Sequence, residues 1–180
     1  RLAKGKGICF IATDFMGLEK PVDVICTLPA EAVTSITLSN NIFDENEILK
    51  LLRFAGLKRL ELTGTEVTDE TIAKLASLQN LETLIVDRTR IRGKFLAKLS
   101  NNKSIRNLKL GHNDLQEQYL KELKKFPNLQ SLTLNSSHLR DKVNARTGRE
   151  TITPDRVRPD DQLLDGFMLK PMNCPGHILI

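Results

Sequence analysis

Thiol and imidazole groups are the side chains of this 180-residue sequence best suited to metal or nucleophilic chemistry, and it has three of each. Cys174 and His177 lie three positions apart, a separation that can chelate a metal ion, although the proline and glycine between them predict a turn. Cys9 and Cys26 form no CxxC pair, and an odd number of cysteines argues against a disulfide scaffold. We expect both to be small buried hydrophobes.

Charge and aromatic content bear on nucleic-acid binding. The formal net charge is +5, but residues 141–180 hold as many acidic as basic groups, so the excess lies earlier in the sequence. Aromatic residues make up only 4% of the chain, so the stacking platform expected of a single-strand binder is missing. We therefore predict a solvated turn rather than a phosphate-binding patch for the one basic cluster: Arg88, Arg90, Arg92, Lys94 and Lys98. His112 and His138 are likewise predicted to be exposed turn residues.

A repeat with a constant spacing of 24 in the numbering organises most of the chain. It appears as apolar triplets with LxxLxL spacing: Val33/Ile36/Leu38, Leu57/Leu60/Leu62, Leu81/Leu84/Val86, Ile105/Leu108/Leu110 and Leu129/Leu132/Leu134. A further apolar residue follows ten positions after each first member: Phe43, Val67, Ile91, Leu115 and Leu139. The eighth position after the first member of each triplet carries a small hydrogen-bonding residue: Asn41, Thr65, Thr89, Asn113 and Ser137. Such residues predict a tight turn in which side chains satisfy backbone groups.

This pattern resembles the leucine-rich repeat family, whose consensus LxxLxLxxNxL has a period in the same range. The resemblance implies an α/β solenoid, with short parallel strands on the concave face and helices or turns outside. Five units are predicted over residues 33–140, after a divergent half-unit or cap at residues 1–32. Alternation along a strand places Leu60 and Leu62 on the buried side and Glu61 on the opposite, polar side. No unit can bury its apolar face alone, so the units must stack.

The second half of each unit predicts a short helix or looser turn, because its apolar residues recur every three positions. Examples are Ile48/Leu51/Phe54, Ile72/Leu75/Leu78 and Leu120/Leu123/Phe126. Asp44 with Glu47 is a variant of the capping box, and Thr68 or Asp69 can cap the next helix. The third unit is the weakest, because Gly93 and Asn102 lie where its helix should begin and end.

The polar strand face is the predicted binding surface, since it is rigid, concave and not dictated by the core. Nothing on it forms a catalytic constellation. Ile85 lies between Glu61 and Lys109 and is a candidate apolar anchor for a protein partner. The candidate partner-binding residues are Arg59, Glu61, Thr83, Ile85, Asp87, Asn107, Lys109 and Thr133. The pattern favours a protein-interaction module that needs no cofactor, with the identity of the partner left open.

The pattern changes after Leu139. Residues 141–164 are polar and broken by prolines, which is typical of a linker. Within residues 165–180, the run LKPMNCPGH resembles a signature of threonyl-tRNA synthetases. That resemblance implies zinc bound by Cys174, a substrate pocket shaped by Met172 and Asn173, and ATP and tRNA as further ligands. The alternative function is therefore a fragment of a threonine–tRNA ligase, incomplete and inactive as it stands.

Apolar runs and the first residues of the chain bear on its location in the cell. No apolar run reaches the roughly 18 residues that a membrane-spanning helix requires, so no membrane span is expected. Residues 1–10 lack the long apolar stretch and cleavage site of a signal peptide. Because the chain starts with Arg1 and its repeats lack a polar final unit, we expect a fragment of a longer protein. Unpaired thiols and the missing targeting signal predict a cytoplasmic protein.

Overall fold

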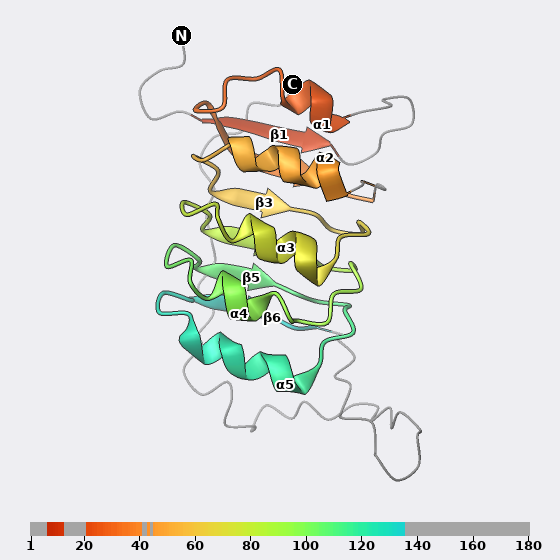
Figure 1. The fold of residues 1–180 in the computed structure, drawn as a ribbon, viewed down its shortest axis with the longest axis vertical. Coiled ribbons are helices and arrows are strands. Elements are labelled where there is room, and N and C mark those ends of the chain that lie inside the picture. The colour runs from red at the N-terminus through yellow and green to blue at the C-terminus, as the bar shows by residue number, and fades with distance from the viewer. Residues whose placement is uncertain (1–6, 13–20, 41–42, 44, 136–180) are drawn as a thin grey trace.

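Short parallel strands form the inner layer of the protein. The computed structural model describes residues 7–12, 21–40, 43 and 45–135. In this part of the chain six strands make one parallel sheet in the order β1-β2-β3-β4-β5-β6. Each strand pairs with the next one along the chain, so the backbone advances coil by coil along one axis (Figure 1). The strands are β1 (Ile8–Ala12), β2 (Val33–Leu38), β3 (Arg59–Glu61), β4 (Thr83–Ile85), β5 (Asn107–Lys109) and β6 (Ser131–Thr133).

Helices form a row along the other side of the sheet (Figure 1). They are α1 (Pro21–Ile25), α2 (Glu45–Lys50), α3 (Asp69–Leu75), α4 (Leu96–Leu99) and α5 (Glu117–Leu120), with the 3₁₀ turns η1 (Leu51–Arg53) and η2 (Lys121–Lys125). This arrangement confirms the predicted α/β leucine-rich repeat solenoid. Within the described ranges, no helix has the length and apolar character needed to cross a membrane.

The core is a ladder of leucines and isoleucines shared between coils. Ile36, Leu60, Leu84 and Leu108 stand in register on β2 to β5, and each is fully buried. Burying such a side chain is worth about 1.5–3 kcal/mol. Strands β3 to β6 are very short, so the burial comes from the neighbouring coils rather than from the strand's own coil.

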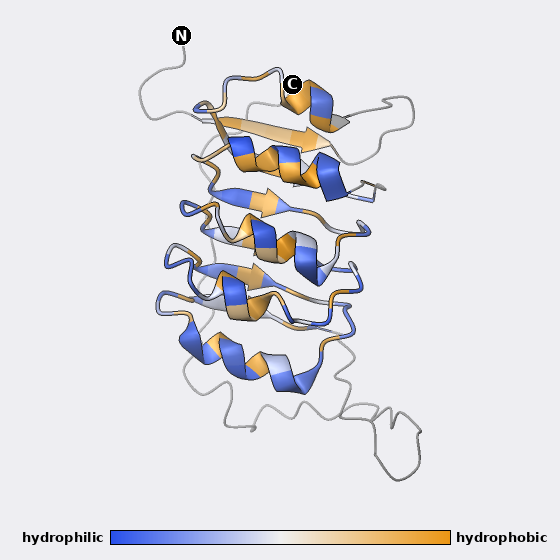
Figure 2. Ribbon diagram, in the orientation of Figure 1, coloured by the Kyte–Doolittle hydropathy of each residue, from blue (hydrophilic) through white to orange (hydrophobic). Residues whose placement is uncertain are grey.

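The outer layer buries the predicted stripe of every third residue. Ile48, Leu51 and Phe54 are fully buried in the second coil, and Ile72 and Leu75 are fully buried in the third. Figure 2 shows the result, with hydrophobic and hydrophilic residues alternating along each helix. The helices are therefore amphipathic, with one face in the shared core.

Helix starts and ends agree with the sequence where the structure describes them. Thr68 is the N-cap of α3, and its Oγ1 accepts a hydrogen bond from the backbone N–H of Thr71 at 3.2 Å. The predicted cap at Asp44 lies outside the described residues. The helix of the weak unit, α4, spans a single turn and follows Gly93, whose φ is +97°.

The expected hydrogen-bonding position in the turn is occupied as predicted. Asn113 is buried, and its amide bonds to two coils. Its Oδ1 accepts from the N–H and Oγ1 of Thr89, and its Nδ2 donates to the carbonyls of Val86 and Leu110. Thr65 Oγ1 in turn donates to the carbonyl of Leu62 at 2.7 Å. The corresponding Asn41 and Ser137 lie outside the described residues.

A second repeating position forces the backbone into the left-handed region. It recurs at the same point of successive coils, with φ values of 56° at Asn40, 69° at Gly64, 56° at Arg88 and 55° at His112. Glycine and asparagine tolerate this conformation, whereas other side chains cost about 1–2 kcal/mol there. Arg88 and His112 are therefore strained in a way that Asn40 and Gly64 are not. His112 is exposed on its turn, as predicted.

The first coil was only partly predicted. The region expected to be a half-unit contains β1 and α1, and β1 pairs in parallel with β2. Its inward residues, Phe10 and Ala12, stand beside Ile36 and Leu38, with a register shift between Ile8 and Cys9. The separation of these partners in the numbering exceeds the repeat spacing by two, so a search with the fixed spacing misses this strand.

We predict that Leu84→Ala lowers the free energy of unfolding by about 2–5 kcal/mol, because the lost methyl groups leave a cavity in the centre of the ladder. Urea denaturation followed by circular dichroism measures the change. Lys109→Ala, at an exposed position on the adjacent strand, is the matched control. An unchanged midpoint for Leu84→Ala would disprove the inward register of β4.

We predict that Arg88→Asn raises the free energy of unfolding by about 0.5–1 kcal/mol, because asparagine relieves the left-handed strain. Gly64→Ala should do the opposite, since its Cβ would stand 2.4 Å from Asn40 Oδ1 at a φ of +69°. Thermal denaturation of the two variants beside the wild type checks both signs. A destabilised Arg88→Asn protein would mean that the arginine side chain makes a compensating contact.

Candidate functional site

The predicted partner-binding residues lie together on the inner face of the sheet. Strand pairing places Arg59, Thr83 and Asn107 in one column, in register with Ser131. A second column carries Glu61, Ile85, Lys109 and Thr133 on the same four strands. Asp87 follows β4 in the adjoining turn. We call this surface the inner face.

Polar groups of the inner face bond to one another. Arg59 and Glu61 form an ion pair at 2.9 Å, with side chains 34% and 23% exposed. Asn107 Nδ2 donates to Thr83 Oγ1 on the neighbouring strand at 3.1 Å. These contacts fix the side chains before any partner arrives, which reduces the entropy lost on binding.

The turn beside the inner face is tied down in the same way. Asp87 Oδ1 accepts a hydrogen bond from the backbone N–H of Gly111, one coil further along, at 2.7 Å. Gly111 is buried, and a Cβ added there would stand 3.0 Å from the carbonyl oxygen of Asn135. Asp87 thus acts in joining coils, a role that its position in the sequence did not indicate.

Ile85 differs from expectation. The sequence suggested an exposed apolar anchor, but the side chain is only 3% exposed. Its neighbours in register on the adjacent strands are Glu61 and Lys109. Because parallel strands lie about 4.8 Å apart, the methylene groups of these two side chains are close enough to cover Ile85. Thr83 is also buried, at 6% exposure. On β3 to β6 the accessible part of the inner face is therefore polar, and Lys109 is exposed there.

The first strand adds residues to the inner face that the sequence analysis missed. Cys9 pairs in register with Ser35, and Ile11 with Thr37, so both belong to the inner-face columns. Ile11 is 41% exposed, unlike most large hydrophobic residues in the described part of the chain. The continuous apolar run over Ile8–Ala12, which has the length of a strand, was the signal that could have revealed it.

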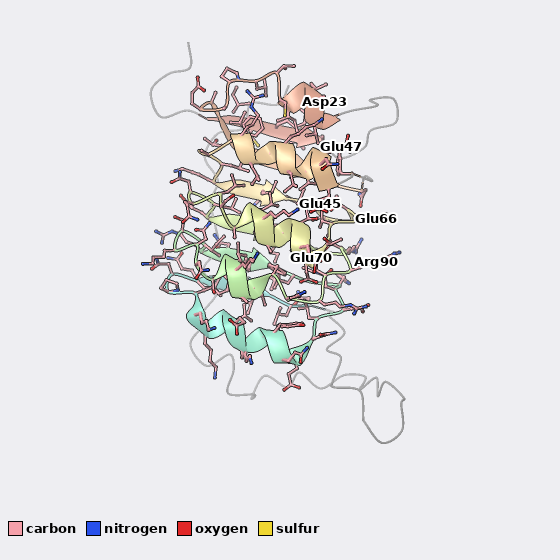
Figure 3. The ribbon with its side chains drawn as sticks, in the orientation of Figure 1. Asp23, Glu45, Glu47, Glu66, Glu70 and Arg90 are labelled. Carbon is pink, nitrogen blue, oxygen red and sulfur yellow. The ribbon has the colours of Figure 1, made fainter. Side chains whose placement is uncertain are left out.

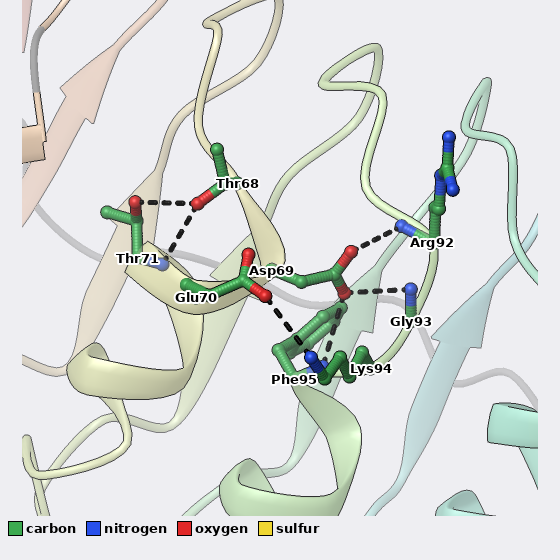
Figure 4. Close-up of polar contacts among 8 residues, drawn as sticks. All are labelled: Thr68, Asp69, Glu70, Thr71, Arg92, Gly93, Lys94 and Phe95. Atoms are coloured by element: carbon green, nitrogen blue, oxygen red, sulfur yellow. Dashed lines mark hydrogen bonds and ion pairs between the residues drawn. The ribbon is translucent and has the colours of Figure 1, made fainter.

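The edge of the solenoid where the loops lead into the helices is held by a carboxylate that reaches across coils. Asp69, the first residue of α3, accepts hydrogen bonds from three backbone N–H groups in the next coil (Figure 4). They belong to Arg92, Gly93 and Phe95, at 2.8, 2.9 and 3.2 Å. The sequence suggested Asp69 as a possible cap for its own helix. Instead, Thr68 caps that helix and Asp69 fixes the loop that leads into α4.

Ion pairs between coils follow the same edge. Figure 3 shows the carboxylates of Asp23, Glu45 and Glu70 along it, and each pairs with a lysine of the following coil. The pairs are Asp23 with Lys50, Glu45 with Lys74, and Glu70 with Lys94. Their exposed side chains make each contribution to stability small.

Two of these paired groups titrate away from their ordinary values. The pKa of Lys50 is raised, mainly by its hydrogen bond to the Asp23 carboxylate. The pKa of Glu70 is lowered, first by a hydrogen bond from its own backbone and then by Lys94. Both shifts favour the charged forms of Lys50 and Glu70.

A cleft of about 600 Å³ opens beside the Asp69 loop. Glu66, Thr89, Arg90 and Tyr119 are among its lining residues. Three members of the predicted basic cluster also line it: Arg90, Arg92 and Lys94. All five members of the cluster are exposed, as predicted for a solvated turn: Arg88, Arg90, Arg92, Lys94 and Lys98. The lining of the cleft carries both signs of charge, with carboxylates from Glu66, Asp69 and Glu70 and cations from Arg90, Arg92 and Lys94.

Candidate metal ligands do not gather in the described ranges. These ranges contain no group of three or more His, Cys, Asp or Glu residues that could hold a metal ion. Cys9 and Cys26 are free and half-buried, rather than fully buried as expected. The residues implied by the synthetase resemblance lie outside the described residues: Met172, Asn173, Cys174 and His177, as does His138.

We predict that Asp69→Ala lowers the free energy of unfolding by about 1.5–3 kcal/mol, because three backbone N–H groups lose a charged acceptor. Glu70→Ala is the matched control, since this neighbouring carboxylate is fully exposed and pairs only at the surface. Urea denaturation gives the stability, and hydrogen exchange at Gly93 N–H reports the loop. Equal effects of the two substitutions would contradict the bridging role of Asp69.

Comparison with solved structures finds similar folds at low sequence identity. Leiomodin-1 Actin-Binding Site 2 has a TM-score of 0.51 and 15% identity, over 69% of this chain and 80% of that chain. The tropomodulin C-terminal domain of Caenorhabditis elegans gives 0.48 and 16%, over 57% and 73%. Human 5T4 (trophoblast glycoprotein) gives 0.47 and 21%, over 58% of this chain and 43% of that one.

The other comparisons return no relative. No protein-family model matches the sequence, and no curated protein matches it. The likeness to leiomodin-1 therefore supports the fold alone, a solenoid of stacked strand and helix coils.

Proposed function

We propose that this chain is a protein-interaction module that binds a protein partner through the inner face. The observation that carries the proposal is the continuous inner face itself, built from side chains in register on successive strands and not used by the core. Solenoids of stacked repeats present such surfaces for binding. On β3 to β5 a partner would meet a polar surface, with Lys109 exposed and the pair Arg59 and Glu61 partly exposed. On β1 it would meet the exposed side chain of Ile11.

The chemistry of this surface supports binding rather than catalysis. Its charged groups are Arg59, Glu61, Asp87 and Lys109, in a pattern of both signs. Mixed charges in a fixed arrangement discriminate between partners by electrostatic complementarity more than they add affinity. Two free thiols, Cys9 and Cys26, favour a reducing compartment, so we place the protein in the cytoplasm as part of this proposal.

The synthetase alternative rests on a short segment of the sequence. It depends on residues 165–180, which lie outside the described residues, and no protein-family model matches that segment. Zinc, ATP and tRNA therefore have no part in the proposed function.

A pair of charge-reversal variants tests the inner face. Lys109→Glu places a negative charge on it, whereas Lys98→Glu makes the same change at an exposed position of α4. We expect Lys109→Glu to weaken partner binding about tenfold or more, because like charges placed opposite each other cost several kcal/mol. Lys98→Glu should leave binding unchanged.

The measurement is photo-crosslinking in cell extract, followed by affinity determination with the purified partner. Actin is the first defined probe, because the similar leiomodin-1 domain is described as an actin-binding site. A photoreactive residue at position 109 should capture the same protein that the wild type binds. Binding lost in Lys98→Glu and retained in Lys109→Glu would place the site on the helical side and refute the inner face.

A further inference from the structure

The last described coil has an open edge. Leu129, Leu132 and Leu134 are only partly buried, whereas their counterparts one coil earlier, Ile105, Leu108 and Leu110, are 0–1% exposed. Within residues 7–12, 21–40, 43 and 45–135, the inward residues of β6 thus lack the neighbouring strand that completes the core at β2 to β5. A solenoid needs a terminal unit to cover this face.

Two backbone groups at the same edge also lack the partners, among the described residues, that their counterparts have in earlier coils. In earlier coils the N–H of the last triplet residue donates to the next coil: Leu62 to Ile85, Val86 to Lys109 and Leu110 to Thr133. The corresponding N–H of Leu134 has no such acceptor among the described residues. Likewise, the carbonyls of Lys58, Glu82 and Arg106 accept from the next coil, and within the described ranges the corresponding carbonyl of Gln130 does not. The edge of β6 is therefore a template for one more strand.

The sequence does not supply that strand at the usual spacing. Continuing the repeat by one period beyond the last triplet leads to Thr153, Arg156 and Arg158, which cannot fill a core. After Leu134, the LxxLxL pattern of apolar residues next occurs at Leu164, Phe167 and Leu169. This triplet begins more than one repeat period after Leu129. Cys174 then occupies the tenth position, where each earlier unit has an apolar residue.

A second triplet in the same segment fails on backbone grounds. Leu169, Met172 and Cys174 have the same spacing, but Pro171 would then occupy the position of Thr83, Asn107 and Ser131. The N–H groups of those three residues donate to the preceding coil, and proline has no N–H to donate. In the triplet Leu164, Phe167 and Leu169, the equivalent position is Gly166, which has an N–H group to donate.

We propose that residues 164–169 of this chain dock on β6 as a seventh parallel strand and close the open end of the core. Phe167 then covers Leu132, Leu164 and Leu169 cover Leu129 and Leu134, and the N–H of Leu134 donates to the carbonyl of Met168. The connection from Asn135 to Leu164 is longer than the one from Gly111 to Leu129, so the chain is long enough to return. The inner face gains Met168 beside Thr133.

Disulfide trapping in the full-length chain tests this pairing. Cys9, Cys26 and Cys174 are first replaced by serine, and cysteines are then placed at Thr133 and Met168, which face each other in the proposed register. Their Cα atoms would be about 4.8 Å apart, within the range that a disulfide spans. The matched control pairs Thr133→Cys with Lys170→Cys, about 7–8 Å away along the same face.

The two outcomes are distinct. An intramolecular bridge that forms about tenfold faster for position 168 than for position 170 supports the docked segment. Equal rates, or bridges between two molecules only, would overturn it, and the second result would assign the edge to another copy of the chain.

Hydrogen exchange provides an independent readout at Leu134 N–H. Phe167→Asp removes the inward side chain of the segment, whereas Met168→Asp makes the same change on the outward side. We expect exchange at Leu134 to accelerate about tenfold or more in the first variant and to stay unchanged in the second. Exchange at the rate of an unprotected amide in the wild type, or equal rates in both variants, would refute the proposal.

Discussion

Lateral stacking of coils is the interaction on which this protein depends. Leu84 is fully buried because Leu60 and Leu108 stand beside it in register, and each of these is buried for the same reason. A strand as short as β4 has no core of its own. Stability is therefore a sum of contacts between neighbouring coils, and every coil needs a neighbour on both sides.

Polar side chains serve the same purpose as the leucines. Asn113 links its turn to the preceding coil through Thr89 and Val86, and Asp69 holds the loop of the following coil through three N–H groups. Asn102 is fully buried and donates to the carbonyl of Leu78, at the equivalent point of the preceding coil. These bonds satisfy backbone groups that the short strands leave open, and they fix the pitch at which the coils stack.

The regular period of the apolar triplets was sufficient to predict the strands β2 to β6 and their inward residues. Side chains of a strand point alternately to the core and away from it, so the inward positions can be recognised in the sequence as apolar residues two positions apart. The first strand, β1, was not predicted because its coil is longer than the others and its pairing with β2 has a register shift after Ile8. The sequence left Thr68 and Asp69 open as alternative caps of α3, because a capping pattern identifies a helix start but not which of two nearby backbone segments a carboxylate bonds. Whether the inner-face residues bind a partner remains a prediction.

Burial of Ile85 changes what kind of recognition the inner face can support. Without an exposed apolar anchor at its centre, affinity must come from many modest polar contacts on a surface that loses little entropy on binding. The bonds that fix Arg59 to Glu61 and Asn107 to Thr83 supply that rigidity, but they also occupy the groups that a partner would use. A partner must therefore match the existing arrangement of donors and acceptors rather than reorganise it, which favours selectivity over affinity. The same stacking that builds the core thus sets the limits of the binding surface.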